Sequence, residues 1–376
     1  MTTEKIKGFN DFTGEEAVKR EEIRKILVSM FEKYGFFPVE TPVIEYEEFV
    51  KGENSSDEAI SDIFKLKDKG KRDLALRCEF TFQLKRIAKN KKLPYKIYQI
   101  GEVFRDEPIK ANRSRQFTQC DVDIIGSSVK DEAEILALTK EVLEKLGVKF
   151  IIYFNNRKLL NEILENLKLK NKRQIFREID KLDKLSEKEV LINLKKIKAE
   201  KILPILKKKE SYFEKYNSYS EIKELKKYCE YYNIKLIFSP SLVRGLSYYN
   251  GTIFEVKVKN FKGSICGGGS YLVDNKQSSG ISFGLERLSS IARIKTEKEK
   301  ILIISLNQDK KAIKLAQKLR KEGKNITIFY GKPSKALEYA NSYKIQKVIF
   351  IGKEEVKKGK FKIKDMKTGK ESYEKF

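Results

Sequence analysis

YKIYQIGEVFRDEPIKANRSRQFTQCDVDIIG, residues 95–126, is the stretch that decides the fold. It contains two strand-like segments, Tyr95 to Phe104 and Gln119 to Ile125, with glycines as punctuation. A similar short segment lies upstream, at Leu74 to Arg77. Together these segments predict an antiparallel sheet.

Helices are expected on both sides of this stretch. Apolar residues from Ile23 to Tyr34 recur at helical spacing until Gly35 stops the pattern, and a second amphipathic helix is expected from Asp131 to Leu146. Phe36 to Val39 is expected to be an edge strand, because Pro38 cannot donate to a sheet ladder. Such a helix and edge strand could meet their symmetry mates in a homodimer.

The strand pattern returns later, at Lys235 to Phe238, Thr252 to Lys259 and Gly280 to Phe283. Between the two groups of strands, from Arg157 to Tyr232, glycine is absent and lysine-rich helical stretches dominate. This change indicates an inserted helical module. The first α+β domain is therefore expected in two parts, residues 1–156 and 233–296, separated by a helical insertion at 157–232.

After Lys300 the chain alternates between strand and helix. Strands are expected at Ile301 to Leu306, Ile326 to Tyr330 and Val348 to Ile351, with helices between them. Such alternation predicts a small three-layer α/β domain with parallel strand pairing, here residues 301–376.

Composition limits the class of protein. The net charge of +26 favours a polyanionic partner such as nucleic acid, although a lysine-biased proteome would give the same excess. The chain has no histidine, which excludes imidazole chemistry and with it serine hydrolase triads and most zinc enzymes. The four cysteines show no paired spacing and no apolar run reaches the length of a membrane span, so a soluble, cytoplasmic protein is expected.

One predicted strand carries a polar face. Strand alternation places Gln119, Asp121 and Asp123 on one side and apolar residues on the other. Two carboxylates could bind a cationic or amine-bearing ligand, while the simpler alternative is a sheet with one solvated face. Just upstream, the loop from Arg105 to Arg115 is rich in arginine, whose forked guanidinium suits bidentate binding of phosphate.

Two further segments attract attention. Gly267, Gly268 and Gly269 lie in a strand context, where they either let a ligand approach the backbone or mark a bulge. Their spacing matches neither a P-loop nor a dinucleotide-binding fingerprint. The second segment, Leu242 to Tyr249, is compact and contains one arginine and two tyrosines.

Taken together, these segments resemble the histidyl-tRNA synthetase family over nearly the whole chain. In this resemblance, the first helix through Gly35 and Pro42 is class II motif 1, Gly101 to Phe117 is motif 2, and Gly284 to Leu288 is motif 3. Leu242 to Tyr249 and Ile265 to Tyr271 resemble two further signatures of the family. The resemblance implies a class II synthetase-like catalytic domain, an antiparallel sheet flanked by helices, followed by an anticodon-binding α/β domain.

The resemblance also implies an activity and its site. Histidine would be activated by ATP, accompanied by Mg²⁺, and transferred to tRNA(His) by a homodimer, with no metal held by the protein itself. The implied ATP-binding residues are Arg105, Glu107, Arg113, Phe117 and Arg287. The implied histidine-binding residues are Glu79, Thr81, Gln119, Asp123, Arg244, Tyr248 and Tyr249, and the catalytic cations are Arg105, Arg244 and Arg287.

The chain departs from the family pattern at several of these positions. Asp123 is one methylene shorter than the usual glutamate, Ser247 replaces an acidic residue, and Ser270 replaces an arginine. Three alternatives stay open. The chain could be a catalytically inactive, histidine-binding regulatory subunit, a class II synthetase for another amino acid, or a purely structural RNA-binding protein.

Overall fold

The computed structural model describes residues 3–52, 62–109, 114–245, 247–296 and 299–376. The chain divides into two compact units, Met1–Ile294 and Lys295–Phe376. Among the described residues, no helix has the length and apolar character that crossing a membrane requires.

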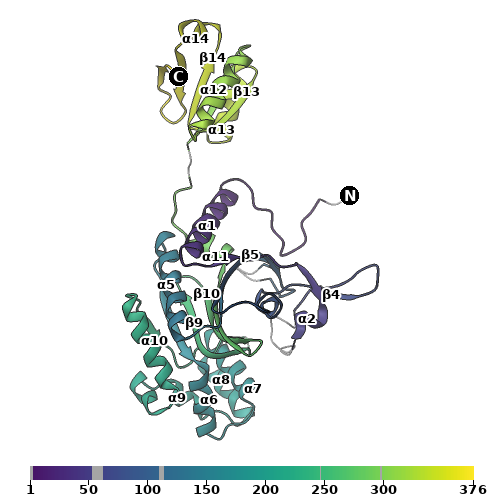
Figure 1. Ribbon diagram of the computed structural model, residues 1–376, viewed down its shortest axis with the longest axis vertical. Helices are drawn as coiled ribbons and strands as arrows, with labels where there is room; N and C mark the ends of the chain where they lie inside the picture. Colours follow the sequence, from purple (N-terminus) through teal and green to yellow (C-terminus); the bar gives the residue numbers. More distant parts are fainter. Residues whose placement is uncertain (1–2, 53–61, 110–113, 246, 297–298) are drawn as a thin grey trace. The chain divides into compact units, whose positions relative to one another are not determined.

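An eight-stranded sheet forms the centre of the first unit, with strand order β1-β5-β6-β11-β10-β9-β7-β8 (Figure 1). The five inner pairs, from β5–β6 to β9–β7, are antiparallel, as the sequence predicts. In chain order the strands are β1 (Phe37–Pro38), β5 (Tyr95–Phe104), β6 (Gln116–Ile125), β7 (Ile151–Asn156), β8 (Leu236–Phe238), β9 (Tyr249–Lys257), β10 (Ser264–Val273) and β11 (Lys276–Gly284).

The two edge pairs of this sheet, β1–β5 and β7–β8, are parallel, so the prediction of an antiparallel sheet is wrong there. A parallel pair needs a long crossover, and both edges have one. A separate three-stranded sheet, β2 (Ile44–Tyr46), β4 (Asp73–Leu76) and β3 (Lys65–Lys67), lies between β1 and β5 in the chain. The helical insertion separates β7 from β8. The strand-like segment predicted at Leu74 to Arg77 corresponds to β4 and belongs to the three-stranded sheet, not to the large one.

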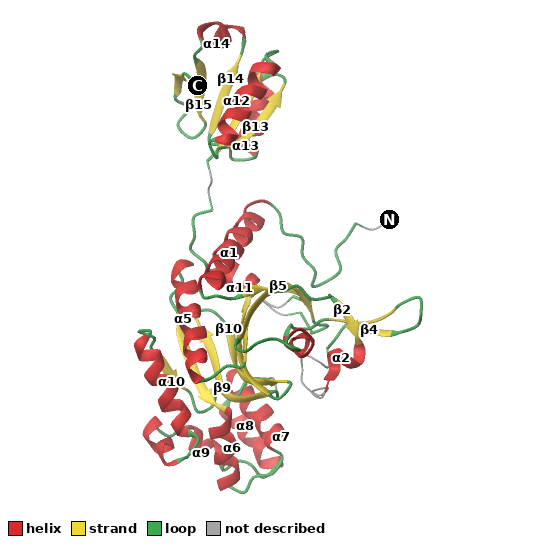
Figure 2. Ribbon diagram, viewed as in Figure 1, coloured by secondary structure: helices red, strands yellow, loops and turns green. Residues whose placement is uncertain are grey.

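Helices cover one face of the large sheet: α1 (Gly14–Lys33), α5 (Val129–Lys145) and α11 (Leu285–Ile291) (Figure 2). The buried stripe of α1, with Leu27 and Phe31, belongs to the same core as Cys120, Val122 and Ile124 of β6. The apolar side of β6 thus faces the helices, so its polar side faces away from them. This part also contains two short helices, α2 (Glu47–Lys51) and α4 (Leu84–Ile87).

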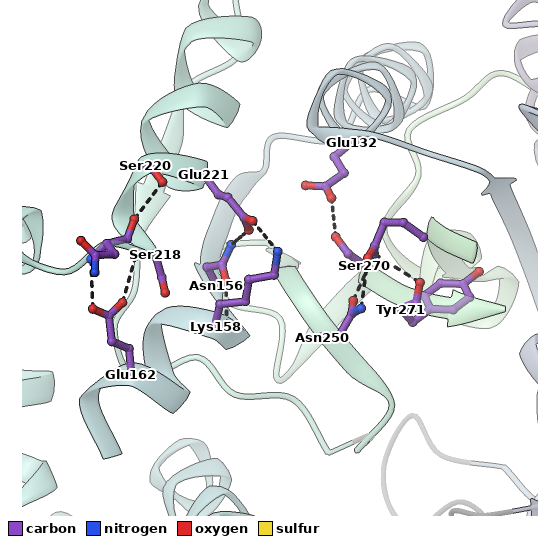
Figure 3. A network of polar contacts seen from close by, with 12 residues as sticks. Glu132, Asn156, Lys158, Glu162, Ser218, Ser220, Glu221, Asn250, Ser270 and Tyr271 are labelled. Atoms are coloured by element: carbon purple, nitrogen blue, oxygen red, sulfur yellow. Dashed lines mark hydrogen bonds and ion pairs between the residues drawn. The ribbon is translucent and has the colours of Figure 1, made fainter. Parts of the chain in front are cut away.

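The insertion consists of helices α6 (Arg157–Asn166), α7 (Lys172–Asp180), α8 (Glu187–Lys196), α9 (Ile202–Leu206) and α10 (Tyr219–Tyr231). A polar network joins it to the end of β7 (Figure 3). Asn156 caps α6 through the Lys158 amide at 2.8 Å, and its side-chain amide donates to Glu221 of α10 at 2.9 Å. Lys158 also pairs with Glu221. The module is therefore anchored to the sheet at the point where it begins.

Glu132 of α5 is a buried carboxyl in a neighbouring part of this network, and it accepts a hydrogen bond from Ser270 of β10 (Figure 3). Burial raises the pKa of Glu132 to about 7, against the lowering effect of hydrogen bonds from Ser270 and Thr252. The folded protein therefore keeps a proton that the unfolded chain begins to release near pH 4.5. The stability that Glu132 contributes is complete below pH 4.5 and is lost as the pH rises through 7.

We expect Glu132→Gln to raise the free energy of unfolding at about pH 8 by about 3 kcal/mol, because the amide is neutral at every pH. At pH 4.5 the variant and the parent should unfold at the same urea concentration. Glu134→Gln is the matched control, since Glu134 lies on the same helix but has a side chain that is 26% exposed and paired with Lys96 at 2.6 Å. Equal pH dependence in Glu132→Gln and the parent would show that Glu132 does not titrate in this way.

The second unit contains a five-stranded sheet of order β13-β12-β14-β15-β16. Its first three strands are parallel, as predicted, whereas β15 and β16 extend the sheet by antiparallel pairs that the sequence did not predict. Ile301 and Ile303 of β12 pack in one core cluster with α12, and Leu302 and Ile304 pack in another with α13. The elements are β12 (Lys300–Ser305), α12 (Asp309–Lys321), β13 (Asn325–Tyr330), α13 (Pro333–Ser342), β14 (Lys347–Ile351), α14 (Lys353–Lys358), β15 (Phe361–Asp365) and β16 (Glu371–Glu374).

Candidate active site

The polar face of β6 is enclosed. Gln119, Asp121 and Asp123 are only 8%, 6% and 5% exposed, so the alternative of a solvated sheet face is wrong. Burial raises the pKa of Asp121 well above its ordinary value, and the neighbouring charge of Asp123 adds to the effect. Among the residues that the structure describes, neither Asp121 nor Asp123 forms an ion pair with a cation. Such buried carboxyl groups favour a ligand that brings a positive charge or N–H donors.

Glycines on the adjacent strands leave room for the site side chains. Gly280 of β11 pairs with Asp123 of β6, and a Cβ on Gly280 would lie 2.1 Å from an Asp123 carboxylate oxygen. Likewise, a Cβ on Gly267 of β10 would lie 2.0 Å from Nη1 of Arg244. Because directly paired residues share a face of the sheet, these glycines and the carboxylate lie on one face. The glycine run therefore accommodates side chains of the site.

Three tyrosines form one wall. The ring centroids of Tyr248 and Tyr249 are 4.8 Å apart, and the ring of Tyr271 lies 5.5 Å from that of Tyr248. The Tyr248 hydroxyl lies 3.3 Å from the Thr81 hydroxyl and donates to Glu79 at 3.4 Å. The structure thus brings together four of the residues predicted to bind the amino acid, which come from segments about 170 residues apart.

Asp123 receives a hydrogen bond from the Tyr271 hydroxyl. Burial raises the pKa of Asp123 to about 7, the hydrogen bond from Tyr271 lowers it, and the charge of Glu79 raises it further. The sequence did not single out Tyr271 as a site residue. The available signal was the alternation along β10, which places Gly267, Gly269 and Tyr271 on the same side.

Arg244 precedes β9 and is largely buried, with a positive φ of 58°. Its Nη1 donates to the Phe254 carbonyl at 3.4 Å and to Glu255 at 3.2 Å. Although burial disfavours the charged form, Tyr249 and Glu255 raise the pKa of Arg244 above its ordinary value, so the side chain stays cationic. Its buried Nε has no hydrogen-bond partner within the described part of the chain. A fixed cation with an open donor can receive an anion.

The other half of the site lies at the end of β5 and the start of β6. The Arg105 guanidinium lies 5.2 Å from the centroid of the Phe117 ring, and its Nε donates to the Cys78 carbonyl at 3.1 Å. Its Nη1 is 3.9 Å from the Glu107 carboxylate. Arg105, Glu107 and Phe117, three of the residues predicted to bind ATP, therefore lie together. Arg113 lies outside the described residues.

Gln119 and Arg287 extend the site along β11. Gln119 donates to the Ser282 hydroxyl at 2.7 Å, and its side-chain oxygen is buried without a partner among the described residues. Arg287 follows β11 on α11 and donates to the Ser264 carbonyl at 2.5 Å. The candidate site thus has an acidic part with tyrosines around Asp123 and a second part that contains Arg105 and Arg287.

Comparison with known proteins gives one consistent result. The family described as histidyl-tRNA synthetase matches residues 8–288, and the anticodon-binding domain family matches residues 300–375. Histidine–tRNA ligase 2 of Shouchella clausii is 34% identical over 412 aligned positions, covering 98% of this chain and 97% of that protein.

Two solved structures share the fold. The histidyl-tRNA synthetase of Nostoc sp. superposes with a TM-score of 0.86 at 25% identity, covering all of this chain and 97% of that one. A Bacillus halodurans protein, described as an ATP phosphoribosyltransferase regulatory subunit/histidyl-tRNA synthetase, gives 0.79 at 21% identity, covering 93% of this chain and 98% of its own. The latter likeness concerns the fold alone.

Proposed function

Because this chain belongs to the histidyl-tRNA synthetase family, we propose how its residues divide the work of that reaction. The enzyme is an ATP-dependent histidine–tRNA ligase of class II: it joins histidine to tRNA(His) through histidyl-adenylate. The observation that carries the assignment of residues is a chain of contacts on the buried polar side of β6. Asp123 accepts from Tyr271, the ring of Tyr271 lies against that of Tyr249, and the Arg244 guanidinium lies 5.6 Å from the centroid of the Tyr249 ring.

Activation needs no nucleophile from the protein, because the histidine carboxylate itself attacks the α-phosphate of ATP. The bond from the α-phosphorus to the bridging oxygen breaks, and diphosphate leaves. The difficulty is to bring two anions together and to stabilise the extra charge of a pentacovalent transition state. Preorganised cations in a water-poor site do this best. We assign that role to Arg244 and Arg105, each of which donates a hydrogen bond to a backbone carbonyl.

We assign the acidic part to the histidine substrate. Asp123 and Tyr249 would bind the two imidazole nitrogens, and Gln119 would bind the α-amino group. Glu79 and Thr81 would line the pocket, and Tyr248 would close its wall. A carboxylate and a phenol aimed at two ring N–H positions reject isosteres, because an isostere leaves these buried groups unpaired. Tyr271 compensates for the shorter Asp123 by donating to its carboxylate and thus fixing its direction.

The arginine-rich part would bind ATP. Phe117 would stack on the adenine, Glu107 would bind the adenine amine, and Arg113 and Arg287 would bind the outer phosphates. Among the described residues, no three Asp, Glu, Cys or His side chains are grouped for a metal ion. Mg²⁺ would therefore arrive as part of the Mg–ATP substrate.

A homodimer and a division of labour between domains complete the proposal. The segment after α1 exposes Phe37, Val43, Ile44 and Tyr46, an apolar strip that a second copy of the chain would cover. A solution mass near 43.8 kDa in sedimentation equilibrium would contradict the dimer.

The unit from Lys295 would bind the anticodon in the cytoplasm, and the +26 charge would make tRNA binding sensitive to salt.

ATP–pyrophosphate exchange with each of the twenty amino acids tests the specificity. We expect exchange with histidine alone. Exchange with a different amino acid would place the enzyme elsewhere in class II. No exchange at all would favour the inactive regulatory subunit. The match of residues 300–375 to the anticodon-binding domain family argues against that alternative.

A further inference from the structure

Arg20 is a buried cation of helix α1 that the proposed reaction does not use. It is 7% exposed, and its guanidinium carbon lies 3.7 Å from the centroid of the Phe12 ring. Its Nη2 donates to the Thr118 hydroxyl at 3.1 Å and pairs with the Glu286 carboxylate at 3.0 Å. One guanidinium nitrogen therefore joins three elements: α1, β6 and α11.

Glu286 adds a second link between the same elements. Both of its carboxylate oxygens lie 3.1 Å from the backbone nitrogen of Thr118, which donates to them. The β6–β11 ladder ends at the pair Gln119–Gly284, so Thr118 is the first residue of β6 beyond that ladder. The Glu286 carboxylate thus continues the hydrogen bonding of β6 where β11 has stopped.

The two partners of Arg20 are direct chain neighbours of ATP-site residues. The nitrogen of Thr118 belongs to the peptide bond that follows Phe117, so fixing it fixes the plane from which the Phe117 ring extends. Glu286 immediately precedes Arg287 in the first turn of α11. We propose that Arg20 is a positioning residue for ATP, which holds Phe117 and Arg287 in place through Thr118 and Glu286.

A role of Arg20 at the ATP site means that its loss affects the binding of ATP and not that of histidine. The histidine pocket is built from Asp123 and the tyrosines, which have no contact with Arg20 among the interactions described above. Removal of the cation leaves the Glu286 carboxylate without its ion-pair partner, so β6 and α11 keep their direct link but lose their common anchor to α1. Small displacements of binding groups have large effects on reactions that depend on geometry. Loss of Arg20 therefore weakens ATP binding and spares histidine binding.

The test is pyrophosphate exchange by the full-length enzyme, with KM measured separately for ATP and for histidine. We expect Arg20→Met to raise the KM for ATP about tenfold and to leave that for histidine unchanged. Arg20→Lys, which keeps a cation near Glu286, should restore most of the affinity. Lys25→Met is the matched control, because Lys25 lies on the same helix and pairs with Glu22 at 3.1 Å.

A double-mutant cycle adds a second criterion. If Arg20 acts through Glu286, the Arg20→Met/Glu286→Gln variant should show no larger rise in the KM for ATP than the more affected single variant. Additive effects, or a parallel rise in both KM values, would overturn the proposal. If Arg20→Met does not fold, Arg20→Lys and Glu286→Gln still decide it through the same comparison of the two KM values.

The inference rests on the proposed roles of Phe117 and Arg287, and their own variants separate the two claims. If Phe117→Ala and Arg287→Ala leave the KM for ATP unchanged, the assignment of the ATP site is wrong. If both raise it and Arg20→Met does not, the assignment stands and the positioning role of Arg20 is wrong.

Discussion

Arg244→Ala is expected to slow formation of histidyl-adenylate about a hundredfold to a thousandfold, with little change in tRNA binding. Loss of one preorganised donor from a site of developing charge typically has this effect. Arg244 is preorganised because the Phe254 carbonyl and Glu255 hold one end of its guanidinium, while its Nε has no partner among the described residues. Single-turnover measurement of adenylate formation gives the rate directly.

Two further variants make this test specific. Gly267→Ala should approach the effect of Arg244→Ala, since the new Cβ would lie 2.0 Å from Nη1 of Arg244 and displace the guanidinium. Arg72→Ala is the control for loss of a positive charge, because Arg72 is exposed and paired with Asp68 at 2.5 Å. If Arg244→Ala were as active as Arg72→Ala, Arg244 would have no part in the chemistry.

Asp123→Ala is expected to raise the KM for histidine about thirtyfold to a hundredfold and to leave that for ATP unchanged. A hydrogen bond to a charged group contributes about 2–3 kcal/mol, and its loss also leaves the imidazole N–H unpaired. Asp123→Asn preserves the size of the side chain and serves if the alanine variant is unstable. Pyrophosphate exchange at varied histidine concentration gives both constants.

Tyr271→Phe tests how much the Tyr271 hydroxyl contributes to histidine binding by Asp123. It keeps the Asp123 carboxylate but removes the hydroxyl that donates to it, so the KM for histidine should rise less than in Asp123→Ala. An unchanged KM for histidine in Asp123→Ala would show that another group reads the imidazole. A rise in Tyr271→Phe alone would assign that reading to Tyr271.

Local pattern in the sequence was sufficient for most elements of the fold. The alternation of Gln119 to Ile124 predicted a strand with one polar face, and the helical spacing from Ile23 to Tyr34 predicted α1. The glycine-free stretch from Arg157 to Tyr232 is helical. These features depend on residues a few positions apart, so a single sequence contains them. The parallel pairing at the two edges of the sheet could not be predicted in this way, because it depends on the long segments that connect the paired strands.

The candidate site also combines features that the sequence indicated with features that only the tertiary structure determined. The sequence, through its motifs, indicated Arg105, Phe117 and the arginine and tyrosines of Leu242 to Tyr249. Only the tertiary structure enclosed the polar face of β6 and placed the Tyr271 hydroxyl on Asp123, 148 positions away. It also placed Arg20 on Thr118 across 98 positions, and Thr118 on Glu286 across 168. Periodicity and capping act within a few turns of the chain, whereas such contacts are set by how strands and helices pack against one another.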